Sequence, residues 1–275
     1  MADPSKKKRL DLLLVERKLV ESREKAKLEI MLGNVKVNGE TIKKPSKLVR
    51  KDAVISLIEN QKYVSRGALK LKGALEDFQI TEELKGKIAC DMGASTGGFT
   101  QILLEFGVRK VYAIDVGYGL LHWKLRKDPK VVVLERTNAR YVCFETLGEM
   151  VDVITCDLSF ISVCKVVPAM LSILKDDGRI ITLIKPQFEA EKEKVRKGVV
   201  RDREIHIYVL EKIWDFMEDS GLKIVGLTFS KLRGPKGNIE FFMHLRKKGK
   251  SIPRFGITKV VDEAHSFFEG KTKYG

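Results

Sequence analysis

The glycine-rich segment from Asp91 to Phe99 places the strongest constraint on how this chain folds. It follows an apolar run, 87–90, that is typical of a short buried strand, and it precedes a segment, 100–106, with the apolar spacing of a helix. A strand that ends at an acidic residue, turns through glycines and enters a helix forms a crevice at the carboxyl edge of a parallel sheet. The sequence therefore predicts an α/β fold with a small-molecule site at this turn.

The residues of this turn argue against a dinucleotide site. The glycine spacing is not G-x-G-x-x-G, and the Asp91 carboxylate would repel a pyrophosphate. A second acid, Asp115, ends the next predicted strand 24 residues later, close to the offset of roughly 20 at which a carboxylate binds a ribose. S-adenosylmethionine carries a ribose and a positive charge but no phosphate, so it is the cofactor that the pattern favours. The alternative is an ordinary glycine-rich turn in another α/β enzyme.

The charge of the chain points to a polyanionic partner. The formal net charge is +15 over 275 residues, and nucleic acid and anionic membrane are the two candidates. No apolar run is long enough to span a bilayer, and the first residues lack the apolar stretch of a signal peptide, so we expect a cytoplasmic protein. The four cysteines show no C-x-x-C spacing and the four histidines are scattered, so we expect no metal site.

The first 60 residues differ from the remainder and predict a separate basic domain. They hold 15 lysines and arginines against nine aspartates and glutamates, a net charge of +6. Ser22 is a plausible N-cap, and Gly33 a plausible end, for the second of two short helices. The predicted elements of this domain are helices over 9–17 and 23–32 and strands over 35–39 and 53–58.

The rest of the chain alternates strand and helix, which predicts a mainly parallel sheet covered by helices on both faces. The last two strands are separated by a short glycine- and proline-containing segment and predict a hairpin, so one strand is expected to be antiparallel. Strands are predicted over 87–92, 110–115, 131–134, 151–156, 179–184, 223–229 and 239–246, and helices over 97–106, 162–174 and 203–219. We expect a linker over 61–66, a catalytic domain over 67–247, and a basic C-terminal tail over 248–275 with an amphipathic helical pattern near 259–268.

Three motifs in the basic domain resemble the S4 RNA-binding module over about residues 7–60. They are Arg-Leu-Asp-x-x-Leu from Arg9, Ser-Arg-x-x-Ala from Ser22, and Gly-x-Val-x-Val-Asn-Gly from Gly33. The resemblance implies that the second helix and the following turn bind structured RNA through its backbone, which fits recognition of RNA by shape and phosphate. The RNA contacts that we expect are Arg9, Arg23, Lys25, Lys27 and Lys36, with Arg23 the best candidate, and Arg66 in the linker.

Four charged residues lie at predicted strand ends or just before the sheet, namely Lys70, Asp157, Lys185 and Glu240. They resemble the lysine–aspartate–lysine–glutamate tetrad of the FtsJ-type ribose 2′-O-methyltransferases. The motifs that carry this resemblance are Tyr-Val-Ser-Arg-Gly-Ala-Leu-Lys, Cys-Asp-Leu-Ser-Phe and Ile-Lys-Pro-Gln-Phe-Glu. With the S4-like module, the whole chain resembles the TlyA (haemolysin A) family of ribosomal RNA methyltransferases.

This resemblance implies S-adenosylmethionine-dependent methylation of cytidine 2′-hydroxyls in ribosomal RNA. It leaves open whether one or both subunits are modified, and whether naked RNA or an assembled subunit is the substrate. Lys185 is expected nearest the hydroxyl, where a neutral amine could accept its proton or an ammonium could stabilise the forming alkoxide. Asp157 would orient Lys185, and Glu240 would position Lys70 or the ribose.

The cofactor contacts that the resemblance implies lie on the glycine-rich turn and at the ends of three strands. Backbone contacts are expected at the turn, and Asp115 is expected to bind the ribose. Asn138 and Ser159 are weaker candidates for the adenine pocket, for which plain loop capping is an equal alternative, and Phe99 fits packing better than stacking. The full set is Asp91, Gly93, Ala94, Ser95, Thr96, Gly97, Gly98, Phe99, Asp115, Asn138, Asp157 and Ser159.

Three other functions are alternatives. A base-directed RNA methyltransferase would need a cysteine nucleophile, for which Cys156 is the only neighbour of the tetrad, or an Asn/Asp-Pro-Pro-aromatic loop, where this chain has Asp-Leu-Ser-Phe. A membrane-active haemolysin finds little support because the sequence has no prominent amphipathic helix. A protein that binds RNA without catalysis would have no need for a complete tetrad.

Overall fold

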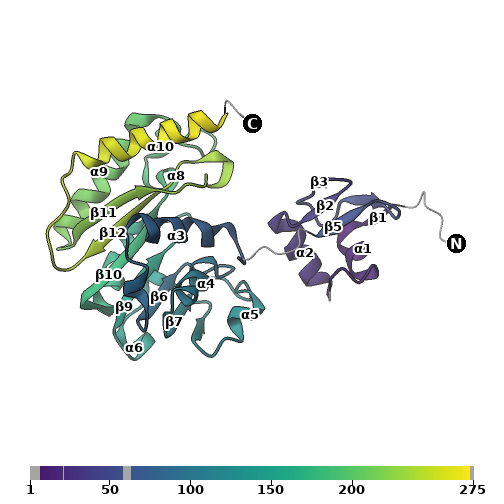
Figure 1. The fold of residues 1–275 in the computed structure, drawn as a ribbon, viewed down its shortest axis with the longest axis horizontal. Coiled ribbons are helices and arrows are strands. Elements are labelled where there is room, and N and C mark those ends of the chain that lie inside the picture. Colours follow the sequence, from purple (N-terminus) through teal and green to yellow (C-terminus); the bar gives the residue numbers. More distant parts are fainter. Residues whose placement is uncertain (1–6, 21, 58–62, 273–275) are drawn as a thin grey trace. The chain divides into compact units, whose positions relative to one another are not determined.

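The computed structural model describes residues 7–20, 22–57 and 63–272. The chain divides into two compact units, Met1–Lys62 and Tyr63–Gly275, and each is described by itself. Figure 1 labels the elements of both units.

The N-terminal unit packs two helices against short antiparallel strands. Its helices are α1 (Leu10–Glu16) and α2 (Arg23–Leu32); β1 (Lys7–Arg9) pairs with β4 (Leu48–Arg50), and β2 (Val35–Val37) lies between β3 (Glu40–Thr41) and β5 (Ile55–Leu57). Residue 58, to which the last predicted strand extends, lies outside the described residues. A small core of its own, which includes Leu10, Leu14, Ala26, Ile30 and Val35, holds the unit together.

The ends of α2 confirm two predictions from the sequence. Ser22 Oγ accepts a hydrogen bond from the backbone N of Lys25 at 3.2 Å, which satisfies a donor in the first helical turn. Gly33 adopts a φ of 81° directly after the helix, a conformation that glycine reaches without steric cost.

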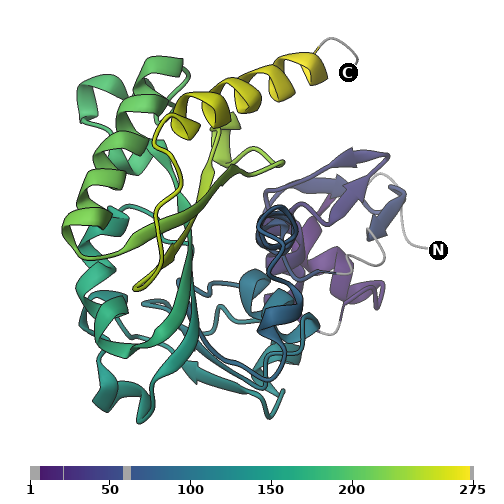
Figure 2. The same ribbon diagram turned by 60° about the vertical axis from the view of Figure 1, so that its left-hand side comes forward.

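A seven-stranded sheet organises the C-terminal unit (Figures 1 and 2). Its strand order is β11–β12–β10–β9–β6–β7–β8. Strands β6 to β10 are parallel, whereas β12 runs antiparallel to both of its neighbours, so the predicted antiparallel strand and closing hairpin are confirmed. The bounds are β6 (Ile88–Met92), β7 (Lys110–Ile114), β8 (Val131–Leu134), β9 (Val151–Cys156), β10 (Leu174–Ile184), β11 (Lys223–Phe229) and β12 (Phe241–Arg246).

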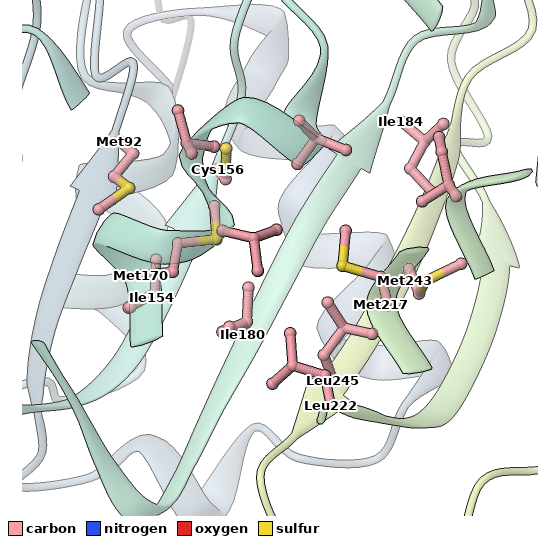
Figure 3. Close-up of a cluster of buried hydrophobic side chains, with 14 of the residues drawn as sticks. Met92, Ile154, Cys156, Met170, Ile180, Ile184, Met217, Leu222, Met243 and Leu245 are labelled. Atoms are coloured by element: carbon pink, nitrogen blue, oxygen red, sulfur yellow. The ribbon is translucent and has the colours of Figure 1, made fainter. Parts of the chain in front are cut away.

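Helices cover both faces of this sheet, because its strands alternate apolar side chains between two cores. One face carries α3 (Arg66–Asp77), α4 (Gly98–Glu105) and α5 (Trp123–Arg126). The other carries α6 (Phe144–Leu147), α7 (Val167–Ile173), α9 (Arg203–Asp219) and α10 (Gly256–Thr272). In Figure 3 the side chains of Ile154, Ile180 and Met243 from the sheet lie among Met170 of α7 and Met217 of α9.

Two helices differ from the prediction: one was not predicted, and the other is longer than its predicted pattern. No helix is predicted over 66–77, because the lysines and glycines between the apolar residues obscure their spacing. In the structure, α3 covers this range and buries Ala68, Leu71 and Leu75. In the segment predicted as a basic tail, α10 extends on both sides of the amphipathic pattern noted near 259–268. It lies beside α9 in both views and contributes Ile257, Val261, Ala264 and Phe268 to the larger core (Figures 1 and 2).

Candidate active site

The carboxyl ends of four parallel strands bring the candidate residues to one edge of the sheet. Met92 pairs in register with Ile114 on one side and with Cys156 on the other, and Cys156 pairs with Thr182 of β10. The strands therefore end at nearly the same level. The segments that follow them carry Gly93, Asp115, Asp157 and Lys185.

Two lysine–carboxylate pairs lie at this edge, each with one buried member. Lys185 Nζ is 2.6 Å from Asp157 Oδ1 and donates a hydrogen bond to Ser159 Oγ at 3.0 Å. Lys70 Nζ donates to Glu240 Oε2 at 2.5 Å. Glu240 is fully buried and Lys185 is 8% exposed, so these two charges depend on their partners in place of water, whereas Asp157 and Lys70 are partly exposed. The two pairings place Asp157 beside Lys185, as the resemblance implies, and Glu240 beside Lys70, one of the two partners that were expected for it.

The strand pairing sets these two ion pairs next to each other. Ile184 and Phe241 are register partners in the antiparallel pair β10–β12, Lys185 directly follows Ile184, and Glu240 directly precedes Phe241. Lys70 reaches this point from the second turn of α3, whose apolar side packs on the same sheet face as α4. The tetrad is thus assembled from α3, β9, β10 and β12.

A pocket of about 430 Å³ opens beside Asp157 and Ser159, within the size range of small-molecule sites. Its wall contains two carboxylates, Asp115 and Asp157, and no lysine or arginine. A nucleoside with a positive charge and no phosphate matches this wall better than a nucleotide does. The lining residues are Gly93, Ser95, Ile114, Asp115, Val116, Leu120, Thr137, Asn138, Ala139, Asp157, Leu158, Ser159, Phe160, Ile161 and Val166.

Gly93 shapes the floor of this pocket. Its φ is +86°, and a Cβ at this position would lie 2.4 Å from the backbone O of Asp157. Only glycine accepts both the positive φ and the close approach of the two segments. The turn after β6 and the end of β9 are therefore packed backbone to backbone.

Asp115 is held in the pocket wall by two backbone groups. Its Oδ2 accepts a hydrogen bond from Ser95 N at 2.8 Å, and its Oδ1 accepts one from Gly117 N at 2.7 Å. Each carboxylate oxygen has a further lone pair, so the group can also accept hydroxyl donors from a ligand. Asn138 lies in the same wall and caps the following turn by accepting from Arg140 N at 3.1 Å.

Six of the residues predicted to contact a cofactor lie outside the pocket wall. Phe99 packs into the core, with its ring centroid 6.1 Å from that of Phe242. Asp91 is fully buried and accepts hydrogen bonds from Thr100 Oγ1 at 2.7 Å and Thr155 Oγ1 at 2.9 Å. Its carboxylate thus faces two threonines within the protein. The others are Ala94, Thr96, Gly97 and Gly98.

Complete burial raises the pKa of Asp91 to about 7, against a usual value of 3.8, although two threonine hydroxyls partly oppose this shift. Between these values the folded protein keeps a proton that the unfolded chain releases, so the free energy of unfolding falls as pH rises. We expect Asp91→Asn to remove this loss. From pH 5 to pH 8, the stability difference should move in favour of the variant by about 2–3 kcal/mol.

Chemical denaturation of both proteins without cofactor at the two pH values measures this difference. Asp152→Asn is a matched control, because burial of Asp152 is outweighed by hydrogen bonds from Lys175 and Ile88 N and its pKa is lowered. That carboxylate is ionised in both states above pH 5, so its replacement should shift stability equally at pH 5 and pH 8. An identical pH dependence in wild type and Asp91→Asn would contradict the assignment.

In the N-terminal unit, two of the predicted RNA contacts converge on one carboxylate. Arg9 Nη2 lies 2.9 Å and Arg23 Nε 3.1 Å from Asp11 Oδ2. Asp11 is buried, and the hydrogen bond from Arg9, supported by that from Arg23, lowers its pKa to about 2. Both guanidinium groups stay about 40% exposed, so they are fixed in position and still reach solvent.

The other predicted RNA contacts are not part of this cluster. Lys25 and Lys27 are partly buried on α2, and Lys36 is exposed on β2. Arg66 belongs to the C-terminal unit, where it begins α3 and donates a hydrogen bond from Nη2 to the backbone O of Arg233 at 2.9 Å.

Several residues near the site were not identified from the sequence. Val116, Leu120 and Ile161 line the pocket, and their place shortly after the ends of β7 and β9 is the signal that could have found them. Glu189 is buried at the end of α8 (Pro186–Glu189) and accepts a hydrogen bond from Val163 N at 2.8 Å. It ties the segment after Lys185 to the segment after Asp157.

The described part of the chain has no group of three or more histidine, cysteine or acidic side chains placed to bind a metal ion. In the same residues, no helix is both long and apolar enough to cross a membrane.

The mostly parallel sheet, with Asp115 and a lysine–carboxylate cluster at its carboxyl edge, has the arrangement of a Rossmann-like methyltransferase. Comparison with known protein families gives the same class. The FtsJ-like methyltransferase family matches residues 63–247, and the S4 domain matches residues 8–55. The chain belongs to the FtsJ-like methyltransferase family and carries an S4 domain at its N-terminal end.

Several known proteins match this chain over nearly its whole length. YqxC of Bacillus subtilis, which is named as a candidate rRNA methyltransferase, is 44% identical over 97% of each chain. The 16S/23S rRNA (cytidine-2′-O)-methyltransferase TlyA of Mycobacterium tuberculosis is 41% identical over 95% of this chain and 98% of its own. A solved structure, titled as a candidate hemolysin of Streptococcus thermophilus, is 40% identical, with a TM-score of 0.77 over 97% of this chain and 98% of that chain.

Proposed function

We propose that this protein transfers a methyl group from S-adenosylmethionine to the ribose 2′-hydroxyl of cytidine in ribosomal RNA, in the cytoplasm. The observation that carries the proposal is the tetrad: two lysine–carboxylate pairs lie at the carboxyl edge of the sheet, and Asp157 of one pair lines a pocket whose charged groups are carboxylates. The names of the full-length relatives support the same reaction.

The pocket residues fit S-adenosylmethionine. Asp115 can accept the ribose hydroxyls, and the apolar side chains of Val116, Leu120 and Ile161 suit an adenine ring. The carboxylates favour a positively charged ligand, and the backbone of Gly93 lines the pocket beside them. When bound, S-adenosylmethionine supplies an electrophilic methyl group on its sulfonium.

The tetrad can prepare a ribose hydroxyl for attack. Lys185 can serve the attacking oxygen in one of two ways: as a neutral amine it accepts the hydroxyl proton, or as an ammonium it stabilises the oxygen while the proton leaves to water. The new bond from oxygen to the methyl carbon forms as the bond from that carbon to the sulfonium sulfur breaks. Asp157 and Ser159 hold the Lys185 side chain in one orientation. The Lys70–Glu240 pair fixes a second charge beside it, so the acceptor ribose meets a rigid, already ordered wall.

A base-directed reaction at carbon is less compatible with the residues present. Cys156 is 1% exposed, and burial raises its pKa to about 12, so it would not supply a thiolate at neutral pH. The tetrad, in contrast, needs no covalent intermediate, because the hydroxyl itself attacks the methyl group.

We assign recognition of the RNA to the N-terminal domain, residues 1–60, and catalysis to residues 67–247. The Arg9 and Arg23 guanidinium groups, fixed on Asp11, present an ordered pair of cations that suits phosphate. Lys36 extends this positive charge on β2.

Incubation of the purified protein with methyl-labelled S-adenosylmethionine and unmodified ribosomal subunits tests the proposal. After digestion of the RNA, mass spectrometry should identify the labelled nucleoside as 2′-O-methylcytidine. Label on a base would overturn the proposed acceptor and make Cys156 the first residue to replace. Absence of label from a preparation that binds the cofactor would refute ribosomal RNA as the substrate.

A further inference from the structure

Two loops of the catalytic unit are joined beside the tetrad by a buried asparagine. Asn238 is 2% exposed; its Oδ1 accepts from Val200 N at 3.0 Å, and its Nδ2 donates to Gly198 O at 3.0 Å and to Pro235 O at 2.9 Å. Lys236 Nζ adds a further bond to Lys197 O at 3.0 Å. Segments 196–201 and 231–238 therefore form one ordered surface.

This surface carries a concentration of unpaired positive charge. Arg196, Lys197, Arg201 and Lys236 are exposed, and we call these four residues the basic surface. Lys194, just before the first loop, pairs with Glu191, and Lys231 of the second loop pairs with Asp77. Among the described residues, none of the four side chains of the basic surface has a carboxylate partner. A hollow of about 710 Å³, partly lined by Arg201 and Lys236, lies between the loops and α10.

The basic surface lies next to the candidate reaction site. A Cβ on Gly234 would lie 2.0 Å from Glu240 Oε1, so the second loop packs directly against the Lys70–Glu240 pair. Arg66 Nη2 donates to the backbone O of Arg233 and ties the start of α3 to the same loop. Arg233 is itself held by Phe268 of α10, at 4.4 Å from its ring centroid.

We propose that the basic surface binds backbone phosphates of the target RNA strand next to the acceptor ribose. This inference rests on the proposed function and adds a second RNA contact, on the catalytic unit. Fixed, unpaired arginines and lysines beside the acceptor site suit a phosphate backbone. The two loops expose none of the large apolar side chains that insertion into a membrane would require.

The test compares two full-length variants with the same loss of charge. The first carries Arg196→Gln, Lys197→Gln and Arg201→Gln. The matched control carries Lys85→Gln, Arg109→Gln and Lys130→Gln, three exposed cations that precede β6, β7 and β8 at the opposite edge of the sheet. Affinity for the target ribosomal RNA is measured over a range of salt concentrations, and calorimetry with S-adenosylmethionine checks that both variants retain the cofactor site.

We expect the first variant to bind RNA at least about tenfold more weakly and to lower the salt slope by about 2, as three lost phosphate contacts would. The control should stay close to wild type. Equal losses of RNA affinity in the two variants would mean that only the net charge of the protein matters, and would overturn the proposal. Wild-type affinity in the first variant would overturn it as well. Failure of the proposed function gives a different result, because wild type would then put no label on ribose whatever the variants bind.

Discussion

Replacement of Lys185 by alanine should abolish methyl transfer and leave the affinity for S-adenosylmethionine largely intact. Lys185 is not part of the pocket wall; its Nζ contacts Asp157 and Ser159, which line the pocket. The variant therefore loses the charge that would stabilise the reacting oxygen, and we expect kcat to fall by at least ~100-fold. Turnover with labelled cofactor and calorimetric titration of the cofactor measure the two effects separately.

Two further variants separate charge from packing in this experiment. Lys185→Met keeps most of the length of the side chain and should be as inactive as the alanine variant. Lys130→Ala removes an exposed cation at the start of β8 and should leave turnover unchanged. Lost cofactor affinity in both Lys185 variants would mean that this lysine serves cofactor binding, and activity retained by Lys185→Met would exclude a role for its charge.

Deletion of residues 1–60 should leave a folded protein that binds the cofactor and has lost most of its RNA affinity. The two units have separate apolar clusters, so the shortened chain keeps all the clusters of the catalytic unit. The deletion retains Tyr63, which is 9% exposed and packs into the core beside α3. It removes six of the fifteen net positive charges, and we expect RNA affinity to fall at least about tenfold.

Thermal unfolding, cofactor titration and RNA binding of the shortened chain check this prediction. A cooperative transition together with wild-type cofactor affinity would establish that the catalytic unit folds alone. If RNA affinity were unchanged, the assignment of RNA recognition to the first 60 residues would be wrong, and the basic surface of the catalytic unit would be left as the principal contact.

Much of the C-terminal fold could be predicted because its local signals agree. β6 and α4 flank a glycine-rich turn, β9 ends at Cys156 directly before Asp157, and the segment between β11 and β12 contains glycine and proline. Strand positions and the final hairpin therefore follow from apolar runs and turn residues. α3 was not predicted because it buries only one side, between lysines and glycines, and its stability comes from packing on α4 and the sheet.

The candidate site could likewise be predicted only in part. The residue types at the strand ends are visible in the chain, and because parallel strands end at one edge, Asp157 and Lys185 could be expected to meet there. The pairing of Glu240 with Lys70, and the contact of Asp91 with Thr100 and Thr155 in place of the pocket, follow only from the folded arrangement. The reason is physical: the face that a strand residue presents, and the neighbours it meets there, depend on register and packing between segments far apart in the chain.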